Sequence, residues 1–281
     1  MMDELNKHYQ WVRLALLASL VFFLIGLFAL VSRWDAAVAL IVFACAFRLI
    51  AVWLARRRYN AAWMQASATA SAEKSMTNVH YTPREEAPSD LLSVLGFTPP
   101  ISLAPQTQLY HVLRGSLSGL PVTVAETAFV RGKDSSAASF GKAISGILLS
   151  AENALPQEEA WVILWHRPFD GLMPLSEFYS AWNYIDTPKG MPPDWTACFT
   201  PGGRTDCLEK AAAVLGPYCR DLGVALAARD GRLSLLLPGV FYAQKPDISR
   251  SPSEEALQGN AIAGLEVLRK LSARMNPPSC V

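Results

Sequence analysis

The chain has 281 residues, of which 51% are hydrophobic, and its 25 basic and 24 acidic residues leave a net charge of +1. That length and composition allow a membrane segment together with one or two folded domains. The neutral balance argues against a general nucleic-acid binder, which would carry a basic face, so we expect no nucleic-acid partner.

Two apolar runs near the start predict a transmembrane hairpin over residues 1–58. The first span, at about 14–32, carries no charge up to Val31, and the second, at about 36–54, is interrupted only by Arg48. A run of about 18 apolar residues is enough to cross a bilayer. Tryptophans stand where an aromatic belt would place them, at Trp11, Trp34 and Trp53. A cleaved signal peptide is the competing interpretation. Signal peptides have an apolar region of about 7–15 residues, whereas the run in this chain is longer and a second apolar run follows it at once.

The basic residues predict how the hairpin is oriented in the lipid bilayer. Lys7 and Arg13 flank the first span and three arginines, 56–58, end the second, whereas the turn carries only Arg33. Lys and Arg collect on the cytoplasmic side of a membrane. We therefore expect a multi-pass protein with both termini in the cytoplasm.

Arg48 is the one charge inside a predicted span. It lies eight residues before Arg56, or about 12 Å along a helix, so its side chain can snorkel to the inner headgroups. The alternative is a polar contact with a partner helix, because a charge within the membrane often marks a site.

After the hairpin we expect a juxtamembrane helix and linker over residues 59–106 and a cytoplasmic domain over 107–276. The alanine-rich stretch 55–79 lacks Pro and Gly, so it should continue the second span as a helix. The polar stretch 82–88 is bounded by prolines and is typical of a linker.

The domain begins with a predicted β-hairpin, Leu109–Leu117 and Leu120–Val130, joined at Ser118-Gly119. With a two-residue turn, Leu117 pairs with Leu120, Val124 faces Leu113, and Glu126 lies opposite His111. A carboxylate beside an imidazole can orient and charge it, as a general base requires. A structural ion pair explains the same two residues, and a catalytic site would need a third group and a pocket.

Further strands and helices predict an α+β fold. Strands are expected at Gly146–Ala151 and Ala160–His166, and a second hairpin, 224–228 with 233–237, turns at Asp230-Gly231. Residues 188–203, with four prolines and three glycines, should form a loop. The predicted helices run from Thr205 to Leu222 and from the capping box at Ser251–Glu254 to about Met275.

The cysteines give little sign of metal chemistry. Cys198, Cys207, Cys219 and Cys280 have no C-x-x-C spacing, so we expect neither a metal nor a cofactor. Cys207 is the most reactive candidate, because it falls in the first turn of a predicted helix, where a thiol pKa is lowered.

The chain resembles the bacterial family of domain of unknown function 3137. The likeness lies in the two-span start, in LRGSLSGLPVTVAETAF, in ISGILLS, in DGRLSLLLPG and in the late helix. Glu126 falls where the family pattern usually has its glutamate. The resemblance implies a bacterial membrane protein and brings no established activity.

These patterns predict a bacterial inner-membrane protein whose cytoplasmic domain binds another protein, a second copy of itself or the membrane surface. The alternatives are a subunit of a membrane complex joined through Arg48 and the spans, and a membrane-anchored hydrolase using His111 with Glu126, or Cys207. A hydrolase predicts a pocket that holds His111 and Glu126. An interaction module predicts an exposed apolar patch instead. An enzyme is the less favoured of these.

Overall fold

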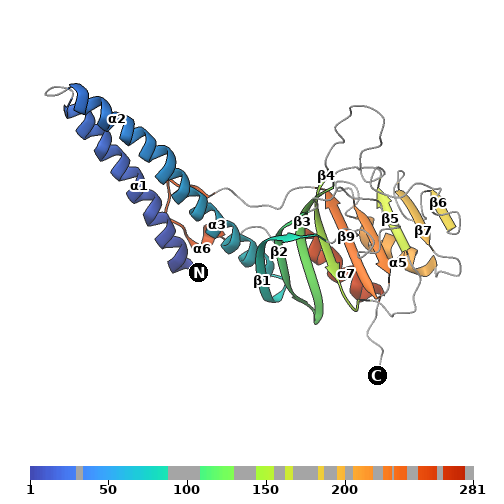
Figure 1. Cartoon of the computed structure of the whole chain (residues 1–281). Helices are drawn as coiled ribbons and strands as arrows, with labels where there is room; N and C mark the ends of the chain where they lie inside the picture. The colour runs from blue at the N-terminus through green and yellow to red at the C-terminus, as the bar shows by residue number, and fades with distance from the viewer. Residues whose placement is uncertain are drawn as a thin grey trace, which may run out of the picture. The chain divides into compact units, whose positions relative to one another are not determined.

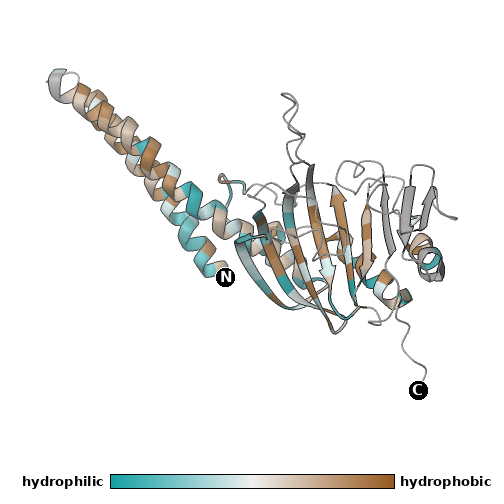
Figure 2. Ribbon diagram, turned by 45° about the vertical axis from the view of Figure 1, so that its right-hand side comes forward, coloured by the Kyte–Doolittle hydropathy of each residue, from teal (hydrophilic) through white to brown (hydrophobic). Residues whose placement is uncertain are grey.

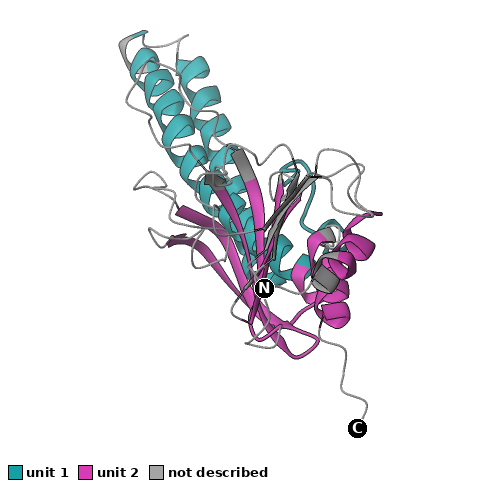
Figure 3. Ribbon diagram, turned by 90° about the vertical axis from the view of Figure 1, so that its right-hand side faces the viewer, with its two compact units in different colours: residues 1–71, 243–259 teal, residues 72–242, 260–281 magenta. Residues whose placement is uncertain are grey.

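The computed structural model describes residues 1–29, 34–87, 108–129, 144–154, 162–166, 183–186, 195–199, 205–217, 224–229, 231–238, 246–257 and 262–275. Figure 3 shows the chain divided into two compact units, which are residues 1–71 with 243–259, and residues 72–242 with 260–281. The first unit is helical and the second is built on a β-sheet.

The first unit contains α1 (Met2–Ala29), α2 (Trp34–Phe47), a π-helix η1 (Arg48–Val52), α3 (Trp53–Glu73) and the short α6 (Glu254–Leu257). α1 lies antiparallel to the continuous helix formed by α2, η1 and α3 (Figure 1). Two helices, Met2–Ala29 and Ala37–Glu73, are long and apolar enough to cross a membrane. Figure 2 shows hydrophobic residues along both of them.

Small residues let α1 and α2 approach closely. Ala37 and Ala44 are buried, and a Cβ added at Gly26 would lie 2.9 Å from Cγ1 of Ile41. Ser19 is also buried, and its hydroxyl donates to the Leu16 carbonyl at 2.7 Å. Contacts between small residues are the usual way for helices to pack where no water drives them together.

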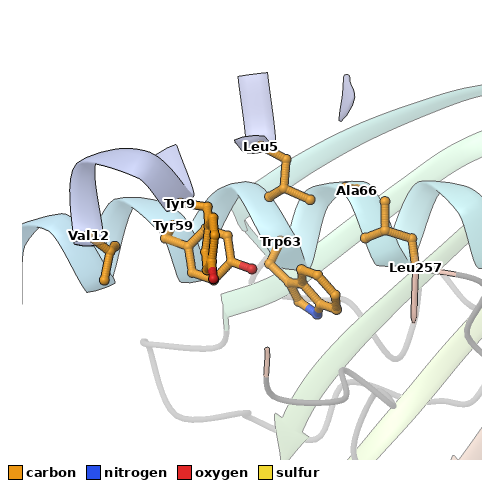
Figure 4. Close-up of a cluster of buried hydrophobic side chains, with 7 residues drawn as sticks. All are labelled: Leu5, Tyr9, Val12, Tyr59, Trp63, Ala66 and Leu257. Atoms are coloured by element: carbon orange, nitrogen blue, oxygen red, sulfur yellow. The ribbon is translucent and has the colours of Figure 1, made fainter. Parts of the chain in front are cut away.

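Beyond the apolar runs, the helices are held together by an aromatic cluster that a later segment closes. The buried members of this basal cluster are Leu5, Tyr9, Val12, Tyr59, Trp63, Ala66 and Leu257 (Figure 4). The Tyr59 ring centroid lies 5.9 Å from that of Tyr9 and 6.1 Å from that of Trp63. Leu257 comes from α6, so the segment 246–257 returns to helices that were made about 180 residues earlier in the chain.

The second unit contains a nine-stranded antiparallel sheet with the order β1-β2-β3-β4-β9-β8-β5-β7-β6. Its strands are β1 (Thr77–Glu86), β2 (Gln108–Leu117), β3 (Leu120–Phe129), β4 (Ile144–Ala151), β5 (Val162–His166), β6 (Asn183–Asp186), β7 (Trp195–Phe199), β8 (Ala225–Arg229) and β9 (Arg232–Pro238). The expected α+β class is therefore confirmed, and both predicted hairpins are present as β2–β3 and β8–β9.

The turns fix the register next to them, as the sequence predicted. Leu117 pairs with Leu120 across Ser118 and Gly119, both of which have positive φ. Leu226 and Leu235 pair in the second hairpin. Asn-, Asp- and Gly-type residues with positive φ match the right-handed twist of the strands they connect.

Helices α5 (Thr205–Leu215) and α7 (Ala263–Met275) contact each other, and α7 packs on β4 and β9. The approach is closest at Gly264, where an added Cβ would lie 2.7 Å from Leu237 and 2.8 Å from Leu149. Leu265, Leu268 and Leu271 are fully buried at the same helix. This gives the sheet a core on one face at its centre.

Three predictions are wrong where the structure has a strand. The expected linker at 82–88 overlaps β1, and so does the end of the expected helix at 55–79. The expected loop at 188–203 contains β7. Pro83 is tolerated in β1 because this is an edge strand, where a missing N–H breaks no ladder on the open side.

The two predicted helices are also too long. α5 ends at Leu215, just before Gly216-Pro217, rather than at Leu222. The expected helix over 251–275 is two helices, α6 and α7, in different units, with Gly259-Asn260 between them in sequence. Its cap is Ser253, whose Oγ accepts from the Ala256 N–H at 3.2 Å, rather than Ser251.

Candidate functional site

A hydrogen bond between two partly buried side chains of the described sheet links Tyr81 of β1 to His111 of β2. The Tyr81 hydroxyl lies 2.7 Å from Nδ1 of His111, and the two rings stack with centroids 6.1 Å apart. His111 has a φ of 50°, in the left-handed region that few residues other than glycine adopt. The histidine is therefore held by an unusual backbone conformation as well as by its side chain.

The cause of this conformation is a β-bulge in β2. Leu113 pairs with Val124, but Tyr110 pairs with Glu126, so His111 and Val112 together oppose the single residue Ala125. The predicted opposition of His111 and Glu126 is wrong by one residue, because the bulge shifts the register beyond Leu113. Glu126 is partly buried and has Tyr110 as its cross-strand neighbour.

Burial keeps both members of the Tyr81–His111 pair neutral. It lowers the pKa of His111 below its ordinary value of 6.5 and raises the pKa of Tyr81 to about 12. A protonated tyrosine donates to Nδ1, which places the ring proton of a neutral histidine on Nε2. The pair is thus a satisfied hydrogen bond at neutral pH.

Chemically, the printed geometry of His111 is a hydrogen bond to Tyr81 that orients the imidazole. A hydrolase would need a nucleophile within hydrogen-bond reach of the base and a cavity for the substrate. The two cavities that lie in the described part of the chain are lined by residues other than His111 and Glu126. A structural role accounts for the Tyr81–His111 hydrogen bond and the ring stacking beside it.

The cysteine candidate is placed only by its backbone. Cys207 lies in the first turn of α5, as expected, but its side chain lies outside the described residues. Its reactivity remains a prediction. Among the described residues, no three His, Cys, Asp or Glu side chains gather in a group that could hold a metal ion.

A second candidate site, which the sequence analysis missed, is a cavity of about 780 Å³ in the helical unit. It lies between α1 and the helix running from η1 into α3, and its polar lining comes from Glu4, Lys7, His8 and Arg58. Four alanines, 15, 18, 51 and 55, also line the cavity, together with apolar side chains. The spacing of the lining residues could have indicated this face of the helices. Residues three and four apart on one helix share a face, and the lining residues of α1 follow that spacing.

The described fold defines an α+β protein that also carries two helices long and apolar enough to cross a membrane. The chain matches no known protein-family model, and comparison with curated proteins and with solved structures gives no significant match.

Proposed function

We propose that the chain is a bacterial inner-membrane protein that crosses the bilayer twice and holds an α+β interaction domain at the cytoplasmic surface. The bacterial origin rests on the family resemblance. The membrane assignment is supported by the exposed surface of the helical unit, and the orientation by its charges.

The observation that carries the proposal is a belt of exposed apolar side chains on the hairpin. Leu17, Leu24, Phe28, Val42 and Leu49 are between 54% and 82% exposed, and only 17% of each apolar window is buried. A core helix of a soluble protein would be mostly buried. Apolar surface of this extent is costly in water, at about 25 cal/mol per Å², but not in hydrocarbon.

The sheet unit contrasts with the hairpin. Among its described residues the only large apolar side chain that is exposed is Tyr110, at 38%. The exposed apolar patch expected of an interaction module is therefore not found among the described residues of this unit. Its edge strand β1 ends in Arg84, Glu85 and Glu86, and Arg114 of β2 contacts both carboxylate oxygens of Glu85 at 2.7 Å. Charged residues and a proline on an edge strand also discourage strand addition, so we propose that a partner of this surface docks through polar contacts.

The direct test combines extraction with topology mapping. We expect the full chain to remain in the membrane pellet after carbonate washing, and reporter fusions at both ends to be active in the cytoplasm. A fusion placed between Val31 and Asp35 should report the opposite side. Recovery of the chain in the soluble fraction, or a periplasmic carboxyl end, would overturn the proposal.

A specific observation favours a second candidate, a subunit of a membrane complex. Arg48 is exposed at the start of the π-helix, and none of the ion pairs among the described residues includes it. An arginine at this depth costs about 2.5–3.5 kcal/mol on insertion scales unless it reaches headgroups or a partner. Recovery of co-purifying proteins from mild detergent, compared between wild type and Arg48→Leu, separates the two. Loss of specific partners in the variant supports the complex, and an unchanged partner set excludes Arg48 as the contact.

A further inference from the structure

The cavity at the base of the hairpin has a polar end and an apolar end. Along α1 its lining runs from Glu4 through Lys7 and Trp11 to Ala18, which is about 21 Å of helix at 1.5 Å per residue. Along the second helix it runs from Arg58 to Phe47. Since the helices are antiparallel, the charged residues of both lie at the same end.

The apolar end is open because four of its lining residues are alanines, although Trp11, Leu14, Phe47 and Leu54 also line the cavity. Ala15 and Ala18 of α1 and Ala51 and Ala55 of the second helix leave space that larger side chains would fill. Ala51 belongs to the π-helix Arg48–Val52. Such wide turns are rare and are frequent at functional sites.

The polar end carries more positive than negative charge. Lys7 and Arg58 provide two cations, His8 is a third basic group, and Glu4 is the single acid. Lys7, Arg58 and Glu4 are all exposed. No ion pair within 4 Å joins Lys7 or Arg58 to a carboxylate among the residues that the structure describes.

A neighbouring face of the same helices is already occupied. Leu5, Tyr9 and Val12 pack into the basal cluster with Tyr59 and Trp63. These positions lie about 90–120° around each helix from the cavity positions, and Ala55 borders both faces. The cavity is therefore the face of the helix pair that the segment 246–257 leaves uncovered.

We infer that this cavity binds one anionic phospholipid of the inner leaflet, its phosphate between Lys7 and Arg58 and an acyl chain along Ala15, Ala18 and Ala51. The inference rests on the proposed membrane insertion, which places the charged end at the headgroups and the alanines in hydrocarbon. A volume of about 780 Å³ is within the range of small-molecule sites. Basic pockets between transmembrane helices on the cytoplasmic side are a known mode of headgroup binding.

The test is native mass spectrometry of the full chain, delipidated in mild detergent and titrated with phosphatidylglycerol or phosphatidylcholine. We expect one phosphatidylglycerol to be retained in preference to phosphatidylcholine. The variant Lys7→Gln/Arg58→Gln should bind it roughly 30-fold more weakly, since each cation near an anionic surface strengthens binding about fivefold. Arg13→Gln/Arg56→Gln, which removes one cation from each helix outside the cavity, is the matched control and should bind almost normally.

A second pair of variants probes the apolar end without changing charge. Ala51→Leu should narrow the cavity and lower phosphatidylglycerol retention severalfold, whereas Ala46→Leu, on an exposed face of α2 outside the cavity, should not. Each variant is first shown to extract and migrate as the wild type does.

Several outcomes would overturn the inference. These are equal retention of the two lipids, equal losses in the cavity variants and their controls, full competition by free glycerol phosphate, or a second copy of the chain that occupies the cavity and is lost with Lys7 and Arg58. A chain that resists carbonate washing but shows no lipid preference would refute this inference alone, whereas a soluble chain would refute the membrane proposal first.

Discussion

A single inserted residue decides what His111 can do. The bulge gives His111 its positive φ, turns its ring toward Tyr81 and moves Glu126 opposite Tyr110. Without the bulge, the histidine and glutamate would be direct cross-strand neighbours, as in a catalytic pair. The local backbone thus favours a buried neutral hydrogen bond over an acid–base pair.

The first prediction concerns pH. Because the pKa of His111 is lower in the folded protein than its ordinary 6.5, the unfolded state binds a proton that the folded state does not. The stability contributed by neutral His111 is therefore complete above pH 6.5 and is lost as the pH falls through that value. We expect the midpoint of thermal unfolding in detergent to fall between pH 7 and pH 5.

The matched variant is His111→Asn, since asparagine tolerates the left-handed conformation. It should be less stable than wild type at pH 7, but its midpoint should depend less on pH over the same range. Parallel pH profiles for the two proteins would show that His111 does not titrate in the way burial implies.

The hydroxyl group of Tyr59 is also a feature of a single residue, because it is buried without a hydrogen-bond partner among the described residues. The Tyr59 side chain is fully buried, and burial raises its pKa. An unsatisfied buried polar group costs about 1–3 kcal/mol. We predict that Tyr59→Phe leaves the unfolding free energy unchanged or raises it by about 1 kcal/mol.

The measurement is denaturant unfolding in detergent, followed by far-ultraviolet circular dichroism. Tyr59→Ala should instead destabilise by about 3–5 kcal/mol, because the aromatic packing is lost. A loss of more than 1 kcal/mol in Tyr59→Phe would mean that the hydroxyl has a partner in the native protein.

At the scale of elements, α6 is too short to be stable alone and is held by what it covers. It has four residues, Glu254–Leu257, whereas isolated helices shorter than about 12 residues are marginal in water. Its stability comes from Leu257, 2% exposed in the basal cluster, and from the cap at Ser253.

We predict that Leu257→Ala destabilises the helical unit by about 2–5 kcal/mol and Ser253→Ala by about 1 kcal/mol. Faster proteolysis within 246–257 would report the release of the segment. Glu255→Ala, at an exposed position of the same helix, serves as the control and should have no effect. An unchanged protease pattern in Leu257→Ala would show that the segment does not depend on this contact.

At the scale of the whole molecule, the edge strand β1 joins the sheet to the end of the membrane hairpin in sequence. A fragment that begins at Ala72 keeps β1, whereas one that begins at residue 107, where the sequence predicted the domain to start, removes it and opens the edge of β2. Exposed edges promote aggregation. We predict that the 72–281 fragment is recovered mainly as a monomer and the 107–281 fragment mainly as aggregate in size-exclusion chromatography.

The features that could be predicted from sequence are those set by neighbouring residues. The turns at Ser118-Gly119 and Asp230-Gly231 and the apolar runs of the hairpin follow from local chemistry. The bulge at His111 and the edge position of Pro83 depend on how strands pair, which no short stretch encodes. The cavity of the helical unit was missed because each helix supplies only part of its lining, and that part has the same spacing as any other amphipathic helix face.

The discontinuous helical unit has a consequence for biosynthesis. The hairpin leaves the ribosome with Tyr59 and Trp63 already made, but Leu257 follows only after residues 72–242. During that interval the segment 246–257 does not yet cover the basal cluster. A nascent chain therefore exposes these apolar side chains until α6 is translated, and in that period a chaperone or an incorrect partner can bind them most easily.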